Sequence, residues 1–104
     1  MSQILNNAIE NYRSSAKSKW EMILTLRTQL KKMEKRIKYY KNVRNVLNKQ
    51  GVSTRLADNS IHDAKYTISN FLERIVHMKK SRKNDFEMIK HLENAKFIEE
   101  SEIQ

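Results

Sequence analysis

The chain has 104 residues, with 21 Lys and Arg against 12 Asp and Glu, one glycine, no proline and no cysteine. A chain of this length forms a single domain, and 38% apolar residues leave it a thin core, which favours association with a partner. The lack of cysteine excludes disulfides, and the scarcity of glycine and proline argues against turn-rich β and α/β folds. No apolar run is long enough to span a membrane and the start lacks a signal-peptide pattern, so we expect a cytoplasmic or nucleoid-associated protein that is not secreted.

A first long helix is expected from about residue 3 to residue 50. A heptad frame with position a at Ile9 places apolar side chains at eleven of the thirteen a and d positions between residues 5 and 47. Helix-breaking residues gather only after this segment, where Gly51 can adopt the left-handed conformation that ends a helix. The sequence therefore predicts a hinge over residues 51–59.

A second helix is expected from about residue 60 to residue 100. Ser60, three residues before Asp63, has the spacing of a capping box, and a frame with a at Ile61 is apolar at eight of ten seam positions. Two sustained seams predict an all-α fold: a long antiparallel helical hairpin of the coiled-coil type, forming one domain over residues 1–104. Folding at the hinge would pair positions whose numbers sum to about 108.

The seams are less regular in the half away from the hinge. Three polar residues occupy seam positions at a similar distance from the hinge: Lys19 in the first frame, and Arg82 and Asp85 in the second. Two interpretations follow: helix breaks near residues 14–18 and 80–85, or continuous helices in which Lys19 and Asp85 pair. We favour continuous helices, because the lysine stem can cover apolar surface while its ammonium reaches the carboxylate.

Several large apolar residues fall outside both seams, and a two-helix hairpin has only one internal interface. We therefore expect a homodimer that forms a helical bundle. The residues expected at its interface are Trp20, Leu72, Val76 and Phe86.

The positive charge is confined to the first half. Residues 1–50 carry twelve basic and three acidic side chains, whereas residues 51–104 carry nine of each. A dense basic stretch on a helix favours contacts with phosphates, so we expect largely sequence-independent binding of DNA or RNA. Under the expected pairing, a second basic cluster at residues 79–83 would lie beside residues 25–29 and extend this surface. The expected contacts are Arg27, Lys31, Lys32, Lys35, Arg36, Lys38, Lys41 and Lys49, with Lys79, Lys80 and Lys83, and the stacking candidate Tyr39.

Other interpretations of the charge stay open. One is a coiled-coil adaptor or inhibitor whose off-seam apolar stripe docks on another protein while the basic residues complement an acidic surface on that target. Another is that the lysines form an ordinary solvated surface. Small, basic, helical chains rich in asparagine and lysine are similar in composition to accessory proteins of phages and other mobile elements.

Catalysis is not expected. His77 and His91 are two heptads apart, and no cysteine or paired carboxylates complete a metal site. No glycine-rich loop is present to hold a nucleotide, and Asp58, Asp63 and Lys65 enter a helix from a hinge, which does not make carboxylates converge. We expect a binding protein without a cofactor or metal.

Overall fold

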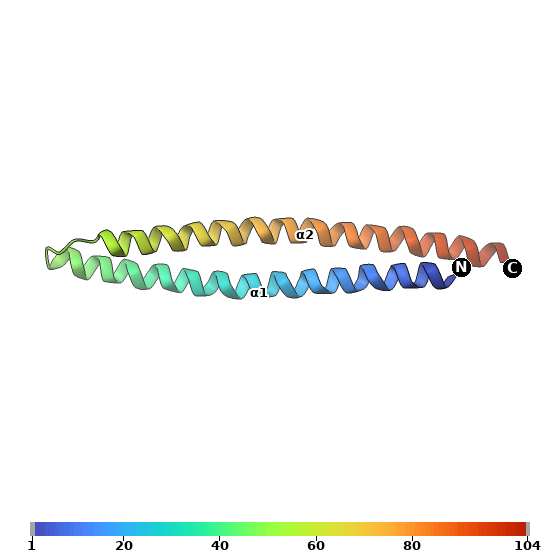
Figure 1. The fold of residues 1–104 in the computed structure, drawn as a ribbon, viewed down its shortest axis with the longest axis horizontal. Coiled ribbons are helices and arrows are strands. Elements are labelled where there is room, and N and C mark those ends of the chain that lie inside the picture. The colour runs from blue at the N-terminus through green and yellow to red at the C-terminus, as the bar shows by residue number, and fades with distance from the viewer. Residues whose placement is uncertain (1, 104) are drawn as a thin grey trace. The chain divides into compact units, whose positions relative to one another are not determined.

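The computed structural model describes residues 2–103, and within them it contains two helices and no strand. Helix α1 comprises Ser2–Lys49 and helix α2 comprises Arg55–Ile103. The chain is thus the expected all-α helical hairpin (Figure 1). Both helices run without interruption through residues 14–18 and 80–85, so the alternative with helix breaks there is wrong.

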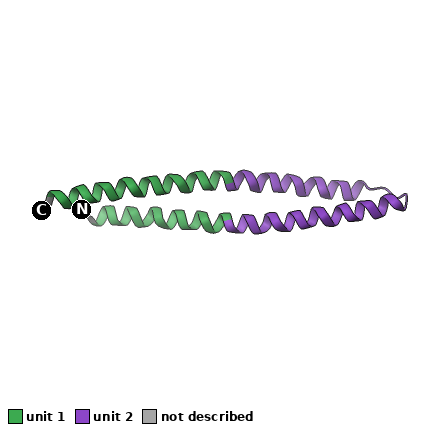
Figure 2. Cartoon of the chain, turned by 180° about the vertical axis from the view of Figure 1, so that it is seen from behind, with its two compact units in different colours: residues 1–23, 76–104 green, residues 24–75 purple. Residues whose placement is uncertain are grey.

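The chain divides into two compact units, and each contains one segment of α1 and one of α2 (Figure 2). Unit 1 consists of residues 1–23 and 76–104, and unit 2 consists of residues 24–75, which include the turn. Each unit has buried apolar residues of its own.

The core of each unit is the expected heptad seam. The buried apolar residues all occupy a or d positions of the two frames, with Ala57 extending the second frame toward the turn. Most remaining seam positions are half-buried, because two paired helices cover each side chain from one direction only. The buried apolar side chains are Ile9, Ala16, Ile23 and Ile89 in unit 1, and Leu26, Ala57, Ile61, Ala64 and Ile75 in unit 2.

Helix α1 ends in a Schellman motif centred on the single glycine. Gly51 has φ +68°, the left-handed conformation predicted for it. The Val52 N–H donates to the Leu47 carbonyl at 3.0 Å, and the Gly51 N–H donates to the Asn48 carbonyl at 3.1 Å. These two bonds satisfy carbonyls that the helix end would otherwise leave unpaired.

Helix α2 begins at Arg55, so the start expected near residue 59 or 60 is wrong. The cap lies earlier: the Ser53 Oγ accepts a bond from the Arg55 N–H at 3.3 Å, and the Asp58 N–H donates to the Thr54 carbonyl at 2.9 Å. Asp58 also accepts a bond from the Thr54 hydroxyl at 2.9 Å, and its charge suits the positive end of the helix dipole. Burial of Ala57 supplies the seam contact that holds this first turn in place.

The shorter turn also changes the pairing of the helices. Ion pairs between α1 and α2 join residues whose numbers sum to 102, 104 and 106, whereas the expected hinge gave about 108. The expected register is therefore displaced by about one helical turn, because the turn occupies residues 50–54 instead of 51–59. The pairs are Arg44 with Asp58 in unit 2, and Lys19 with Asp85 and Arg13 with Glu93 in unit 1.

Candidate nucleic-acid interface

The two units differ sharply in charge. Unit 2 carries twelve Lys and Arg against four Asp and Glu, a net charge of +8, whereas unit 1 carries nine against eight, a net charge of +1. The sequence places the excess positive charge on the first helix. The division into units shows that this excess lies on the part of α1 that follows Ile23. Unit 2 is therefore where a polyanion would be attracted.

The cations of α1 in unit 2 are dense and reach solvent. Six of them lie between Lys31 and Lys41, a helix rise of about 15 Å, and Glu34 is the one acidic residue in that stretch. The exposed cations of the whole segment are Arg27, Lys31, Lys32, Lys35, Arg36, Lys38, Lys41 and Lys49. All eight were expected to contact nucleic acid, and the structure places them together on one helix segment of unit 2.

These charges are largely uncompensated. Among residues 2–103, no carboxylate lies within ion-pair distance of any of the six cations from Lys31 to Lys41. Arg44 differs from them, because its Nη1 lies 3.6 Å from the Asp58 Oδ1 on α2 and the side chain is partly covered. The six cations can therefore bind an external anion without first breaking an internal ion pair.

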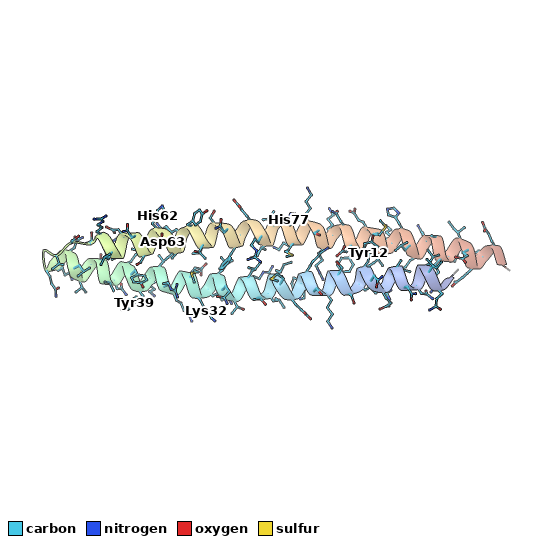
Figure 3. All side chains as sticks on the ribbon, in the orientation of Figure 1. Tyr12, Lys32, Tyr39, His62, Asp63 and His77 are labelled. Atoms are coloured by element: carbon cyan, nitrogen blue, oxygen red, sulfur yellow. The ribbon has the colours of Figure 1, made fainter. Side chains whose placement is uncertain are left out.

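The basic residues surround the outer part of α1 and do not form a single line. Figure 3 shows Lys32 and Tyr39 on the side of α1 that faces away from α2. Other cations occupy heptad positions b, e, f and g, which flank that side. A distribution of this width suits contacts with phosphates along a backbone better than readout of base edges, which requires a few side chains aimed at one groove.

The two adjacent tyrosines have the different positions that the heptad frame predicts. Tyr40 is half-buried at the seam, and Tyr39 is 63% exposed. Their ring centroids are 5.3 Å apart with an interplanar angle of 71°, an edge-to-face contact. The seam tyrosine thus supports the exposed ring from one side and leaves its outer face open.

The second expected cluster belongs to the other unit. Lys79, Lys80 and Lys83 are exposed on α2 in unit 1, where acidic residues almost balance the basic ones. Lys79 and Lys83 line an open groove of about 500 Å³ together with Trp20 and Phe86. Their surroundings are therefore partly apolar, unlike those of the basic residues on α1 in unit 2.

Arg82 has a role that the sequence did not predict. Its guanidinium carbon lies 4.9 Å from the centroid of the Trp20 ring and 4.8 Å from that of Phe86, so the cation is held between two aromatic rings. Its Nε is buried and has no hydrogen-bond acceptor among the described residues. The spacing of Arg82 and Phe86, one helical turn apart, was the available signal, but the third member comes from α1.

An ion pair lies beside this cluster, since Lys19 and Asp85 directly precede Trp20 and Phe86 in the sequence. The Lys19 Nζ donates to the Asp85 Oδ2 at 2.8 Å, and the two side chains are 24% and 8% exposed. Pairing of Lys19 with Asp85 was the interpretation that the sequence favoured, and the structure confirms it. The pair allows two polar residues to occupy the seam of unit 1 without leaving a buried charge alone.

The four residues expected at an oligomer interface are exposed to different degrees. Trp20, Val76 and Phe86 belong to unit 1 and are 37%, 68% and 46% exposed, and Leu72 belongs to unit 2 and is 50% exposed. Trp20 and Phe86 line the same groove, and neither Leu72 nor Val76 lines it.

Within the described part of the chain, no three His, Cys, Asp or Glu side chains gather as metal ligands would. Neither α1 nor α2 contains, over those residues, a stretch that is apolar enough to cross a bilayer. Comparisons with protein-family models, with curated proteins and with solved structures find no match to this chain.

Proposed function

We propose that the chain binds nucleic acid, DNA or RNA, through the phosphate backbone and without sequence preference, using α1 in unit 2. The observation that carries the proposal is the run of six exposed cations from Lys31 to Lys41, none of them ion-paired within residues 2–103. Each cation that neutralises a phosphate releases condensed counterions, which makes binding favourable at low salt. Such a protein would act in the cytoplasm or on the nucleoid.

The same mechanism predicts the salt dependence. Five or six phosphate contacts give a slope of about −5 for log affinity against log salt concentration on duplex DNA. Tyr39 adds a stacking surface for unpaired bases, and this would favour single strands over duplexes of equal length. A protein that reads bases would instead retain a sequence-dependent part of its affinity at high salt.

The test is a fluorescence-anisotropy titration with duplex DNA, single-stranded DNA and RNA at about 50 to 300 mM salt. The variant changes Lys31, Lys35 and Lys38 together to Glu, and binding should be lost. A second variant with the same change in net charge serves as the matched control. Lack of binding to all three probes at the lowest salt would refute the proposal.

The control changes Lys17, Lys65 and Arg74 together to Glu. All three are exposed, and none of them belongs to the basic segment from Arg27 to Lys49. The control should weaken binding only slightly, because the residues that contact phosphates are unchanged. Equal loss of binding in both variants would show that total charge, and not the surface of α1, determines binding.

The alternative function is that of an adaptor or inhibitor that docks on another protein through exposed apolar residues. The observation that favours it is the groove beside Trp20 and Phe86, which has a partly apolar lining. Unlike the run of free cations, this groove lies in unit 1, which is almost neutral. An adaptor of this kind would keep its partner after Lys31, Lys35 and Lys38 are changed to Glu.

A further inference from the structure

One face of α2 in unit 1 carries a stripe of exposed residues with alternating spacings of four and three. Residues with these spacings lie on one side of a helix. The stripe residues from Lys79 to Lys90 line the groove beside Trp20. The rest line a second groove of about 390 Å³, beside Asn6 and Arg13 of α1. The stripe consists of Lys79, Lys83, Phe86, Lys90, Glu93, Phe97 and Glu100, all exposed.

The charged residues of this stripe have opposite signs at equal distances on the two sides of its middle. Starting between His91 and Leu92 and moving outward in the two directions, the first positions are Lys90 and Glu93, the next are two phenylalanines, and the third are Lys83 and Glu100. From Lys83 to Glu100 the spacings in the two directions are equal, so these six residues of the stripe coincide with themselves when the helix is reversed. A reversal of this kind is what a two-fold axis perpendicular to the helix produces.

We propose that the stripe is a dimer interface, in which α2 packs antiparallel against α2 of a second copy of this chain. The two-fold axis passes between His91 and Leu92. It places Lys83 opposite Glu100 and Lys90 opposite Glu93 of the second copy, and Phe86 opposite Phe97. Each contact occurs twice because the interface is isologous.

The exposure of the two phenylalanines and the charges of the stripe both support a second copy of this chain as the partner that covers it. Phe86 and Phe97 are 46% and 69% exposed, so the interface removes two phenyl rings per copy from water. The lysines of one half-stripe meet the carboxylates of the other, whereas a parallel arrangement would place like charges opposite one another. The carboxylates retain acceptor capacity, since Arg13 binds only the Oε1 of Glu93 and Lys96 lies 4.0 Å from the Oε1 of Glu100.

This interface refines the dimer expected from the sequence. Phe86 is central to it, and Trp20 lines the adjoining groove. Val76 is 68% exposed, but the two-fold axis places no described residue opposite it. Leu72 belongs to unit 2 and is likewise outside the paired segment. The proposal uses unit 1 alone and does not depend on nucleic-acid binding.

Sedimentation equilibrium with reversed charges tests the pairing. Lys83→Glu places two carboxylates opposite one another at two symmetry-related positions, and Glu100→Lys does the same with two ammonium groups. Each variant alone should dimerise about thirtyfold more weakly than the wild type. An equimolar mixture of the two variants should form a heterodimer, because every Glu at position 83 then meets a Lys at position 100. Damage to the fold of one chain would not be repaired by mixing.

Val76→Glu is the matched control, since it adds a carboxylate to the same helix outside the paired segment, and it should leave dimerisation unchanged. The orientation is tested with cysteines, which the natural chain lacks. Under oxidation, a mixture of Phe86→Cys and Phe97→Cys chains should give covalent dimers, and Phe86→Cys alone should not.

Four results would overturn the proposal. The first is a monomeric wild type at about 100 μM, a concentration at which a dimer of ordinary affinity would be populated. The second and third are single variants that dimerise as strongly as the wild type and mixed variants that stay monomeric. The fourth is efficient crosslinking of Phe86→Cys to itself. A monomeric wild type would mean that the grooves are available to bind another protein.

Discussion

The buried pair of Lys19 and Asp85 gives an asymmetric prediction for stability. Lys19→Met leaves the Asp85 carboxylate, 8% exposed and without another hydrogen-bond partner among the described residues, in the seam of unit 1. Breaking a buried ion pair in this way costs about 3 kcal/mol, because the remaining charge is desolvated and unpaired.

The reverse change should cost less. Asp85→Leu leaves a lysine whose side chain is 24% exposed, and its flexible stem can carry the ammonium to water. The expected loss is about 1 kcal/mol. In the double variant, apolar residues replace both charges, and its stability should lie within about 1 kcal/mol of the wild type.

The assay is urea unfolding followed by circular dichroism, with all four proteins at one concentration because the proposed dimerisation would add to stability. The two single variants and the double variant form a double-mutant cycle, with an expected coupling energy of about 4 kcal/mol. The reasoning would be refuted if Asp85→Leu cost as much as Lys19→Met, or if the coupling energy were below about 0.5 kcal/mol.

Three further changes test local features by the same unfolding assay. Gly51→Ala should cost about 1 kcal/mol, because φ is +68° although nothing lies within 4 Å of the added Cβ, and no loss would contradict the left-handed end of α1. Thr54→Ala should cost about 1 kcal/mol by removing the hydroxyl that binds Asp58, whereas an unchanged midpoint would mean that the cap lies elsewhere. Arg82→Ala should cost about 1 kcal/mol and shift the fluorescence of Trp20, the single tryptophan, to longer wavelength; unchanged emission would argue against the stacked guanidinium.

The features that were predictable from the sequence are those that depend on periodicity. Both heptad frames identify the buried residues, because every side chain buried in the seam repeats at the spacing of the helix. Gly51 was identifiable because a left-handed residue is needed where a long helix ends and glycine adopts that conformation without strain. The exposed cations follow from the same frames, which place them outside the seam.

The start of α2 was not predictable from local preference. Residues 57–60, Ala-Asp-Asn-Ser, are typical of a turn, but Ser53 and Thr54 already cap the helix and Ala57 is buried against α1. The error in the start then propagated to the register, since the length of the turn determines which residues of α1 and α2 are opposite one another.

The pair of Lys19 and Asp85 was expected, but two other features that combine both helices were missed for the same reason. Arg82 lies between Trp20 and Phe86 only in the observed register, and a periodic pattern does not choose among the partners that a long side chain can reach. The stripe on α2 is visible in the sequence once its spacing is known. The two grooves beside it are lined partly by residues of α1, and the spacing within α2 does not indicate which ones.

The division of charge between the units connects the two proposals. Unit 1, with a net charge of +1, can bring two copies together without strong repulsion, whereas pairing two units of +8 would be opposed by their charge. The proposed dimer uses unit 1 and none of the basic residues of α1 in unit 2, so under both proposals one assembly would carry two phosphate-binding surfaces. When both engage one polyanion, the second contact becomes intramolecular and the affinity exceeds that of either segment alone. Segregation of charge between the two units is therefore the feature that would make the proposed self-association and the proposed polyanion binding compatible in one short chain.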